Sequence, residues 1–119
     1  MIQQEIQQRS EQIALMLGWE QYQDYEERWF GHWKPNTTLE KPWSIRVERL
    51  EFHSDWNWLM EAVEFIEIKG YEIGIFANRV EIITTIEENR VYETGGKTKK
   101  EAVFIAVSDF ARQFNLYKL

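Results

Sequence analysis

The side chains that could carry out acid–base, nucleophilic or metal chemistry are few and scattered along this chain. His32 and His53 are its only histidines, and it has no cysteine. A zinc site would need both histidines together with carboxylates, and neither histidine has such a partner at ligand spacing. The lack of cysteine excludes disulfides, thiolate metal ligands and thiol nucleophiles. We therefore expect no metal ion, no cofactor and no enzymatic activity.

Serine and carboxylate groups do not change this expectation. A serine nucleophile assisted by histidine usually stands in a tight-turn motif, and no such motif surrounds any serine of this chain. Paired carboxylates can act as acid and base in a cleft. Glu61 and Glu64, however, share the helix surface opposite the apolar stripe, where solvated acids are the simpler interpretation.

One glycine-containing motif resembles the end of a phosphate-binding loop. Gly95-Gly96-Lys97-Thr98 matches the last part of the pattern G-x-x-x-x-G-K-[ST], but Val91 stands where the first glycine should be. A hairpin turn followed by a helix cap explains these residues without a nucleotide. Lys97, Lys99 and Lys100 would lie beside the following helix N-terminus and could attract an anion weakly. Solvated surface lysines are the favoured interpretation.

A segment rich in aromatic residues is the better candidate for a binding surface. Ten of the eighteen aromatic residues lie between Trp19 and Trp58. Rings presented from irregular structure can stack on sugars or bases or anchor a protein partner, and basic neighbours would favour an anionic ligand. The residues that we predict to form this surface are Arg28, Trp29, Phe30, Trp33, Lys34 and Trp43. The alternative is that these large rings fill a small core.

Length and charge limit the class of protein. With 119 residues the chain fits one domain, residues 1–119, with a single hydrophobic core. The formal net charge is -6 and the pI about 5.0, which argues against nucleic-acid binding, since that needs a basic surface. No apolar run approaches the roughly 18 residues of a membrane span, and the N-terminus has no signal-peptide pattern. We therefore expect a cytoplasmic protein that does not enter a membrane.

The first half of the chain is expected to hold one helix, an ambiguous segment and a strand. Residues 2–17 have an amphipathic pattern with Ile13 and Leu17 on the apolar stripe, and Gly18 can end this helix in a left-handed conformation. Residues 19–42 fit either a helix or an irregular strand. Trp43, Ile45 and Val47 alternate with polar residues, as in a half-buried strand.

The segment Phe52–Met60 combines a helix start with a broad apolar face. Ser54 or Asp55 is expected to cap a helix that runs to about Lys69 and ends at Gly70. Trp56 and Trp58 are expected to flank the stripe that packs on a sheet. The central residues of that stripe are Leu59, Ala62, Val63 and Ile66.

The second half predicts an antiparallel meander followed by a helix. The alternating segments are 71–75, 80–86 and a short third strand at 91–92. Thr98 and Glu101 fit a capping box at the start of the last helix, whose buried stripe includes Val103 and Phe110, with Ile105 exposed nearly opposite. This order predicts an α+β fold in which three helices pack on an antiparallel sheet of three to five strands.

Several of these segments together carry a family resemblance. They are FHSDWNWLMEAVE at 52–64, Ile66-Glu67, Gly70-Tyr71, the Thr98 cap, Glu101-Ala102-Val103, Ala106-Val107 and Phe110. They resemble a group of small phage- and prophage-encoded proteins of Bacteroidetes-type bacteria that has no established activity. Less closely, the order of elements and Met16-Leu17-Gly18-Trp19 are similar to the phage ABA-sandwich domain family. The resemblance implies a cytoplasmic accessory protein made in an infected or lysogenic host, and it transfers no catalytic residue.

Small size, acidity, the lack of a catalytic motif and the resemblance favour a non-enzymatic accessory protein. It would act through contacts with a phage or host protein, or by homo-oligomerisation. The alternative is a small-ligand or nucleic-acid-end binding module that uses the aromatic segment from Trp29 to Trp43. A third hypothesis is a hydrolase that uses a pair of carboxylates, and it is supported only by the large number of acidic residues.

Overall fold

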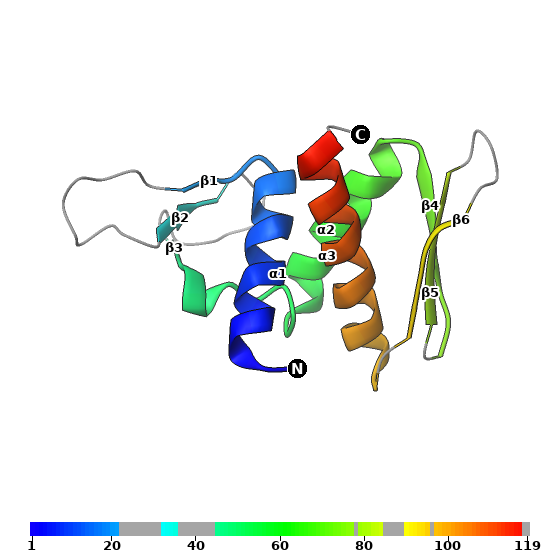
Figure 1. Ribbon diagram of the computed structural model, residues 1–119, viewed down its shortest axis with the longest axis horizontal. Helices are drawn as coiled ribbons and strands as arrows, with labels where there is room; N and C mark the ends of the chain where they lie inside the picture. Colours follow the sequence, from blue (N-terminus) through cyan, green and yellow to red (C-terminus); the bar gives the residue numbers. More distant parts are fainter. Residues whose placement is uncertain (22–31, 36–44, 78, 85–89, 96, 118–119) are drawn as a thin grey trace.

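The computed structural model places three helices between two small antiparallel sheets (Figure 1). It describes residues 1–21, 32–35, 45–77, 79–84, 90–95 and 97–117. The elements in chain order are α1 (Gln3–Met16), β1 (Glu20–Gln21), β2 (His32–Lys34), β3 (Ile45–Arg46), the 3-10 helix η2 (Val47–Arg49), α2 (Trp56–Ile68), β4 (Tyr71–Ile75), β5 (Arg79–Thr84), β6 (Arg90–Gly95) and α3 (Lys99–Tyr117). The predicted α+β class, with three helices and antiparallel strands, is confirmed.

The strands divide between two three-stranded sheets, β1-β2-β3 and β4-β5-β6. In the second sheet Ile73 pairs with Ile82, and a register irregularity follows between Ile82 and Ile83. The predicted meander is confirmed, but its third strand is longer than the two residues expected, because β6 runs to Gly95. The predicted strand at Trp43–Val47 is shorter than expected. Among the described residues, Ile45–Arg46 form β3 and Val47 already begins η2, so the strand ends one residue earlier than predicted, while residues 43–44 lie outside the described part.

The three helices run in the same direction. The Lys100 ammonium donates to the Ser54 carbonyl at 3.0 Å, which joins the starts of α3 and α2. Near the other ends of these helices, the Phe65 and Phe114 rings meet at 5.5 Å. Each helix therefore begins near the end marked N in Figure 1 and ends near the end marked C. Each three-stranded sheet connects the end of one helix to the start of the next helix in the chain.

The core lies between the helices and the inner face of the β4-β5-β6 sheet. The predicted stripe of α2 is buried, and Val80 and Ile82 of β5 are 0% exposed beneath the helices. Removing such a side chain from water stabilises the fold by about 1.5–3 kcal/mol. A second part of the core is aromatic: the ring of Phe52 lies 5.2 Å from Trp19 and 5.3 Å from Trp58. Trp58, which was predicted to flank the buried stripe of α2, is half-buried against the core and packs on rings that precede α2.

α3 is buried along two sides, which corrects the prediction of a single apolar stripe. Phe104 and Ser108 are 1% and 2% exposed on the side toward α1, while Val103 and Phe110 are 0% exposed on the side toward the sheet. Ile105 was expected to be exposed, but it is half-buried because α1 packs along this side. The sequence does not indicate this contact with α1, because Ser108 and the other polar residues near Ile105 are typical of a solvent-facing side of a helix.

The helix ends follow the predicted local chemistry. Asp55 caps α2, and its carboxylate accepts a hydrogen bond from the Asn57 amide at 2.8 Å. Thr98 accepts from the Glu101 amide at 3.1 Å at the start of α3. Gly18 and Gly70 adopt φ values of 83° and 99° after the first two helices, as glycine does at helix C-termini.

Within the described residues, no helix is both long and apolar enough to cross a membrane.

Candidate functional site

Only two of the six residues predicted to form an aromatic surface lie within the described part of the chain. Trp33 is 1% exposed and belongs to the core, so its ring is not available at the surface, which corrects the prediction for this residue. It is buried because β2 pairs with β3 and directs this side chain inward. Lys34, the next residue on the strand, is exposed. The other four residues, Arg28, Trp29, Phe30 and Trp43, lie outside the described residues.

Several other residues singled out in the sequence lie within the described ranges. No group of three histidines, aspartates or glutamates in the described ranges could hold a metal ion. His53 borders a hollow of about 210 Å³ together with Lys100 and Phe104, and its ring lies 6.0 Å from that of Phe104. Thr98 of the glycine-containing motif is occupied in capping α3. Lys97 and Lys99 are exposed beside that cap, as solvated lysines are.

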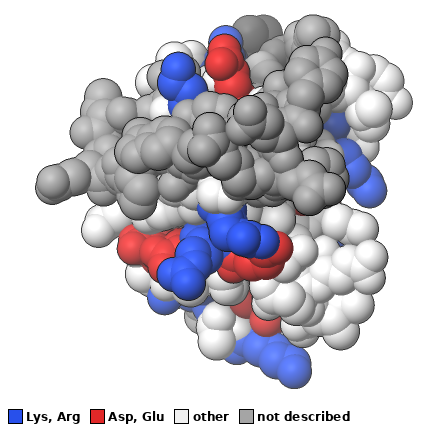
Figure 2. Space-filling view, turned by 90° about the vertical axis from the view of Figure 1, so that its left-hand side faces the viewer, with Lys and Arg blue, Asp and Glu red and all other residues white. Residues whose placement is uncertain are grey.

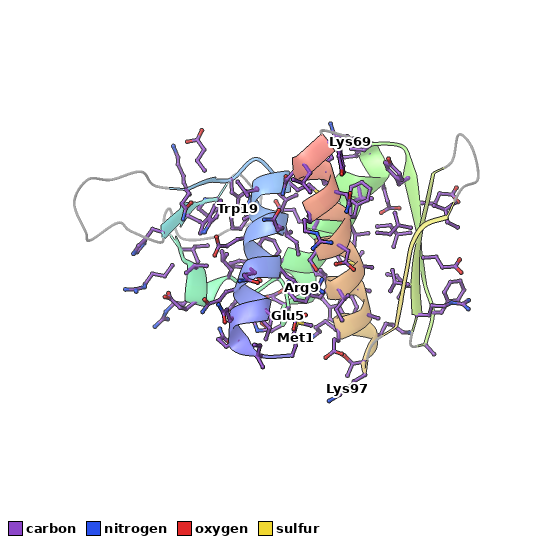
Figure 3. The ribbon with its side chains drawn as sticks, viewed as in Figure 1. Met1, Glu5, Arg9, Trp19, Lys69 and Lys97 are labelled. Atoms are coloured by element: carbon purple, nitrogen blue, oxygen red, sulfur yellow. The ribbon has the colours of Figure 1, made fainter. Side chains whose placement is uncertain are left out.

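The seam between α1 and α3 holds the densest group of charged and polar contacts among the described residues. Arg9 projects from α1 toward α3, with Glu5 one turn before it (Figure 3). Its Nη1 donates to the Asp109 carboxylate at 2.8 Å and to the Ser108 hydroxyl at 2.9 Å. Its Nε donates to Glu5 at 3.1 Å. The guanidinium therefore joins two carboxylates that stand on different helices.

These contacts line a hollow of about 310 Å³ between the two helices. Its walls also carry Gln8, Gln12 and Arg112. Above it, the Asn115 amide donates to both the carbonyl and the side-chain oxygen of Gln12 at 2.9 Å. Burial by itself would lower the pKa of Arg9, but the hydrogen bonds and charges of Asp109 and Glu5 outweigh it and raise the pKa. The charged guanidinium of Arg9 therefore stabilises the packing of α1 against α3.

Two rows of side chains border this seam on its open side. On α1 the row is Gln4, Gln8, Glu11 and Leu15, and on α3 it is Ile105, Asp109, Arg112 and Leu116. Both rows have the spacing 4-3-4, which keeps side chains on one face of a helix. We call these eight residues the α1–α3 face. Leu15 is 47% exposed and Leu116 is 65% exposed, so the face has an apolar end.

The charges of the α1–α3 face are only partly matched within the chain. Arg112 is exposed and makes no ion pair or hydrogen bond with another described residue. Glu11 is half-buried, and burial raises its pKa above the usual range of a glutamate. No described cation forms a salt bridge with it. The face therefore presents one acid and one base that lack counter-ions in the described structure.

The side of the molecule that carries β1-β2-β3, at the left of Figure 1, has a different character. In the part drawn in colour, basic and acidic side chains are interspersed and form no field of one sign (Figure 2). Arg46 and Glu48 are one such pair, at 3.2 Å, and both are exposed. Exposed pairs of this kind contribute about 0–1 kcal/mol. The charges seen here suit solubility better than they suit a polyanionic ligand.

Sequence reasoning missed the α1–α3 face. Arg9 and Asp109 are 100 positions apart, and nothing local in the chain indicates that they meet. The sequence contains one signal of it: Leu15 points away from the apolar stripe that holds Ile13 and Leu17. A solitary exposed leucine needs no explanation, and only the structure shows that α1 packs beside a helix that carries a second exposed leucine, Leu116.

Comparison of the chain with models of protein families, with curated proteins and with solved structures finds no match.

Proposed function

We propose that this chain is a non-enzymatic accessory protein of the phage or prophage type that acts through protein–protein contacts. The observation that carries the proposal is the α1–α3 face, where two packed helices present exposed leucines beside an arginine that has no ion-pair partner in the described structure. Exposed apolar groups combined with arginine are typical of residues that anchor protein interfaces. The resemblance of residues 52–114 to small phage proteins supports the same class of function.

The chemistry of the seam favours a binding surface over a reaction centre. A general base or nucleophile must be free to meet a substrate, whereas Arg9, Asp109 and Glu5 are engaged with one another. Ser108 accepts from Arg9 and donates to the Ile105 carbonyl at 3.0 Å, so its hydroxyl is engaged as well. These groups join the two helices to each other. A partner would contact the α1–α3 face, which lies outside them.

Sedimentation with fluorescence detection tests this proposal. The labelled protein is followed at nanomolar concentration in lysate of a Bacteroidetes-type host, with and without phage infection, and separately as purified protein up to several hundred micromolar. We expect a faster-sedimenting species in at least one of these series. A protein that sediments as a monomer in all of them does not act through stable protein contacts, and the proposal is then wrong.

A second candidate function is a small-ligand or nucleic-acid-end binding module built around residues 29–43. The observation in its favour is a hollow of about 210 Å³ lined by Gly18, Glu20, Lys34 and Pro35, beside the exposed Lys34 ammonium. Titration of tryptophan fluorescence with nucleotides, short oligonucleotides and sugars tests it, with Lys34→Ala as the matched variant. An unchanged spectrum at millimolar ligand excludes this candidate.

A further inference from the structure

We propose that the partner of the α1–α3 face is a second copy of this chain, related by a two-fold axis that runs parallel to the two helices. This inference rests on the proposed function, because it names the occupant of the same face. It follows from the positions of the two rows of side chains along the helix axes, which we call their heights, and from the charges of these side chains.

The hydrogen bonds across the seam set the heights of the two rows. Arg9 bonds to Ser108 and Asp109, and Gln12 bonds to Asn115. Because the two helices are parallel, residues of α1 and α3 that lie at the same distance along the helix axes differ by about 100 in residue number. The rows differ by 101 at each of their four positions. Gln4, Gln8, Glu11 and Leu15 therefore stand at about the same heights as Ile105, Asp109, Arg112 and Leu116, respectively.

A two-fold rotation about an axis parallel to the helices keeps every height and exchanges the two helices. It places α1 of one copy over α3 of the other, and the reverse contact follows by symmetry. Glu11 then faces Arg112 of the other copy, and Leu15 faces Leu116. Gln8 faces Asp109, whose carboxylate can accept from an amide N–H. Each favourable pair occurs twice, and no pair brings together two charges of the same sign.

The rotation also supplies the counter-ions that Glu11 and Arg112 lack among the described residues of their own chain. Arg112 gains a carboxylate partner, and Glu11 gains a guanidinium that would favour its charged form against the effect of burial. The exposed leucines gain apolar contacts at one end of the interface. A two-fold axis perpendicular to the helices would reverse the heights in the second copy, so Glu11 would no longer face Arg112 and Leu15 would no longer face Leu116. The heights of the rows therefore favour the axis parallel to the helices.

The size of the face sets the expected strength. α1 has 14 residues and is thus about 21 Å long, and two adjacent helices are roughly 20 Å wide. The footprint is then about 400 Å² per copy, or about 800 Å² in total, which is below the roughly 1,200 Å² of standard interfaces and corresponds to a weak, transient contact. We expect reversible dimers with a Kd on the order of 10–100 µM, which are monomeric at the nanomolar concentrations of the lysate experiment.

Charge reversal with mixing tests the proposed pairing. Glu11→Lys brings two basic side chains together twice in the dimer, since the new ammonium meets Arg112 of the other copy. Arg112→Glu brings two carboxylates together twice, so each variant alone should dimerise at least about tenfold more weakly. When the two variants are mixed, both contacts of the heterodimer join a base to an acid. We therefore expect sedimentation equilibrium of the mixture to recover the affinity of the parent protein.

Glu64→Lys serves as the matched control, since it makes the same charge change at an exposed position of α2. It should leave dimerisation unchanged, and thermal melts of all variants at 1 µM show whether each is folded. A parent that stays monomeric at 500 µM overturns the inference, as do charge reversals that leave dimerisation unchanged or a mixture that fails to recover it. A partner found in lysate at nanomolar concentration would in those cases leave the proposed function standing.

Discussion

Replacing Arg9 by methionine isolates the energetic role of the seam between α1 and α3. Methionine keeps most of the aliphatic stem of arginine and removes the guanidinium, so the packing of the stem is nearly retained. The change deletes the hydrogen bonds to Asp109, Ser108 and Glu5 in one step. Asp109 is one-third exposed and can be rehydrated, so no charge is left buried without water.

The expected cost is the sum of three contributions. The pair with Glu5 lies on one helix and contributes about 0.3–0.5 kcal/mol. The bond to the buried Ser108 hydroxyl contributes about 1 kcal/mol. The partly exposed contact with Asp109 adds about 1 kcal/mol, at the upper limit for surface pairs. Arg9→Met should therefore lower the free energy of unfolding by about 2 kcal/mol, or the melting temperature by roughly 8 °C.

Urea unfolding followed by tryptophan fluorescence at 1 µM measures this difference below the range of self-association. Arg112→Met is the matched control, since Arg112 lines the same hollow without an ion pair in the described structure, and it should change stability by less than about 0.5 kcal/mol. A double-mutant cycle with Asp109→Asn should give a coupling energy of about 1 kcal/mol. If both arginine variants unfold alike, Arg9 does not hold the seam, and the heights used to pair the two rows lose their support.

Three further predictions concern the same fold. Asp55→Ala should lower the stability by about 1 kcal/mol in urea unfolding, because its carboxylate caps α2, while Ser54→Ala should change it by less than about 0.5 kcal/mol; equal effects would mean that the cap is assigned to the wrong residue. Phe52→Ala should cost about 3–5 kcal/mol, because this ring is 0% exposed between Trp19 and Trp58, and a melting temperature close to that of the parent would place the ring outside the core. Glu11→Gln at 1 µM should stabilise the protein at pH 7 and have no effect below about pH 4. Burial raises the folded pKa of Glu11, so the stability associated with its neutral form is complete below the unfolded pKa of about 4.3 and is lost as the pH rises through the folded value. Thermal melts from acidic to neutral pH that show no pH-dependent difference would contradict it.

The sequence predicts the features of this fold that depend on neighbouring residues. The helix starts at Ser54 or Asp55 and at Thr98 and the turn at Gly70 follow from local backbone chemistry, and the structure confirms them, with Asp55 as the cap of α2. The buried stripe of α2 follows from the helical period of apolar residues, because only one face of that helix meets the core.

The contacts that define the candidate site are between residues far apart in the sequence, and no local pattern specifies them. Ser108 is polar and still buried, because the guanidinium of Arg9 satisfies its hydroxyl from another helix. The prediction of a binding surface at Trp33 depends on its place in a segment that looks irregular in the sequence, whereas in the structure it lies on β2, which pairs with β3, and its ring is buried in the core. In both cases a tertiary contact decides the environment of the side chain.

The packing of α1 against α3, the first and last helices of the chain, has a consequence for how the chain folds during synthesis. The residues joined by Arg9 and Asp109 are 100 positions apart, so the partner surface of α1 does not exist until α3 has been made. At about 5–20 residues per second, a ribosome needs roughly 5–20 s to cover that distance. During this interval the apolar side of α1, with Ile13 and Met16, lacks its final cover. The nascent chain thus passes through a stage at which a chaperone can bind its first helix.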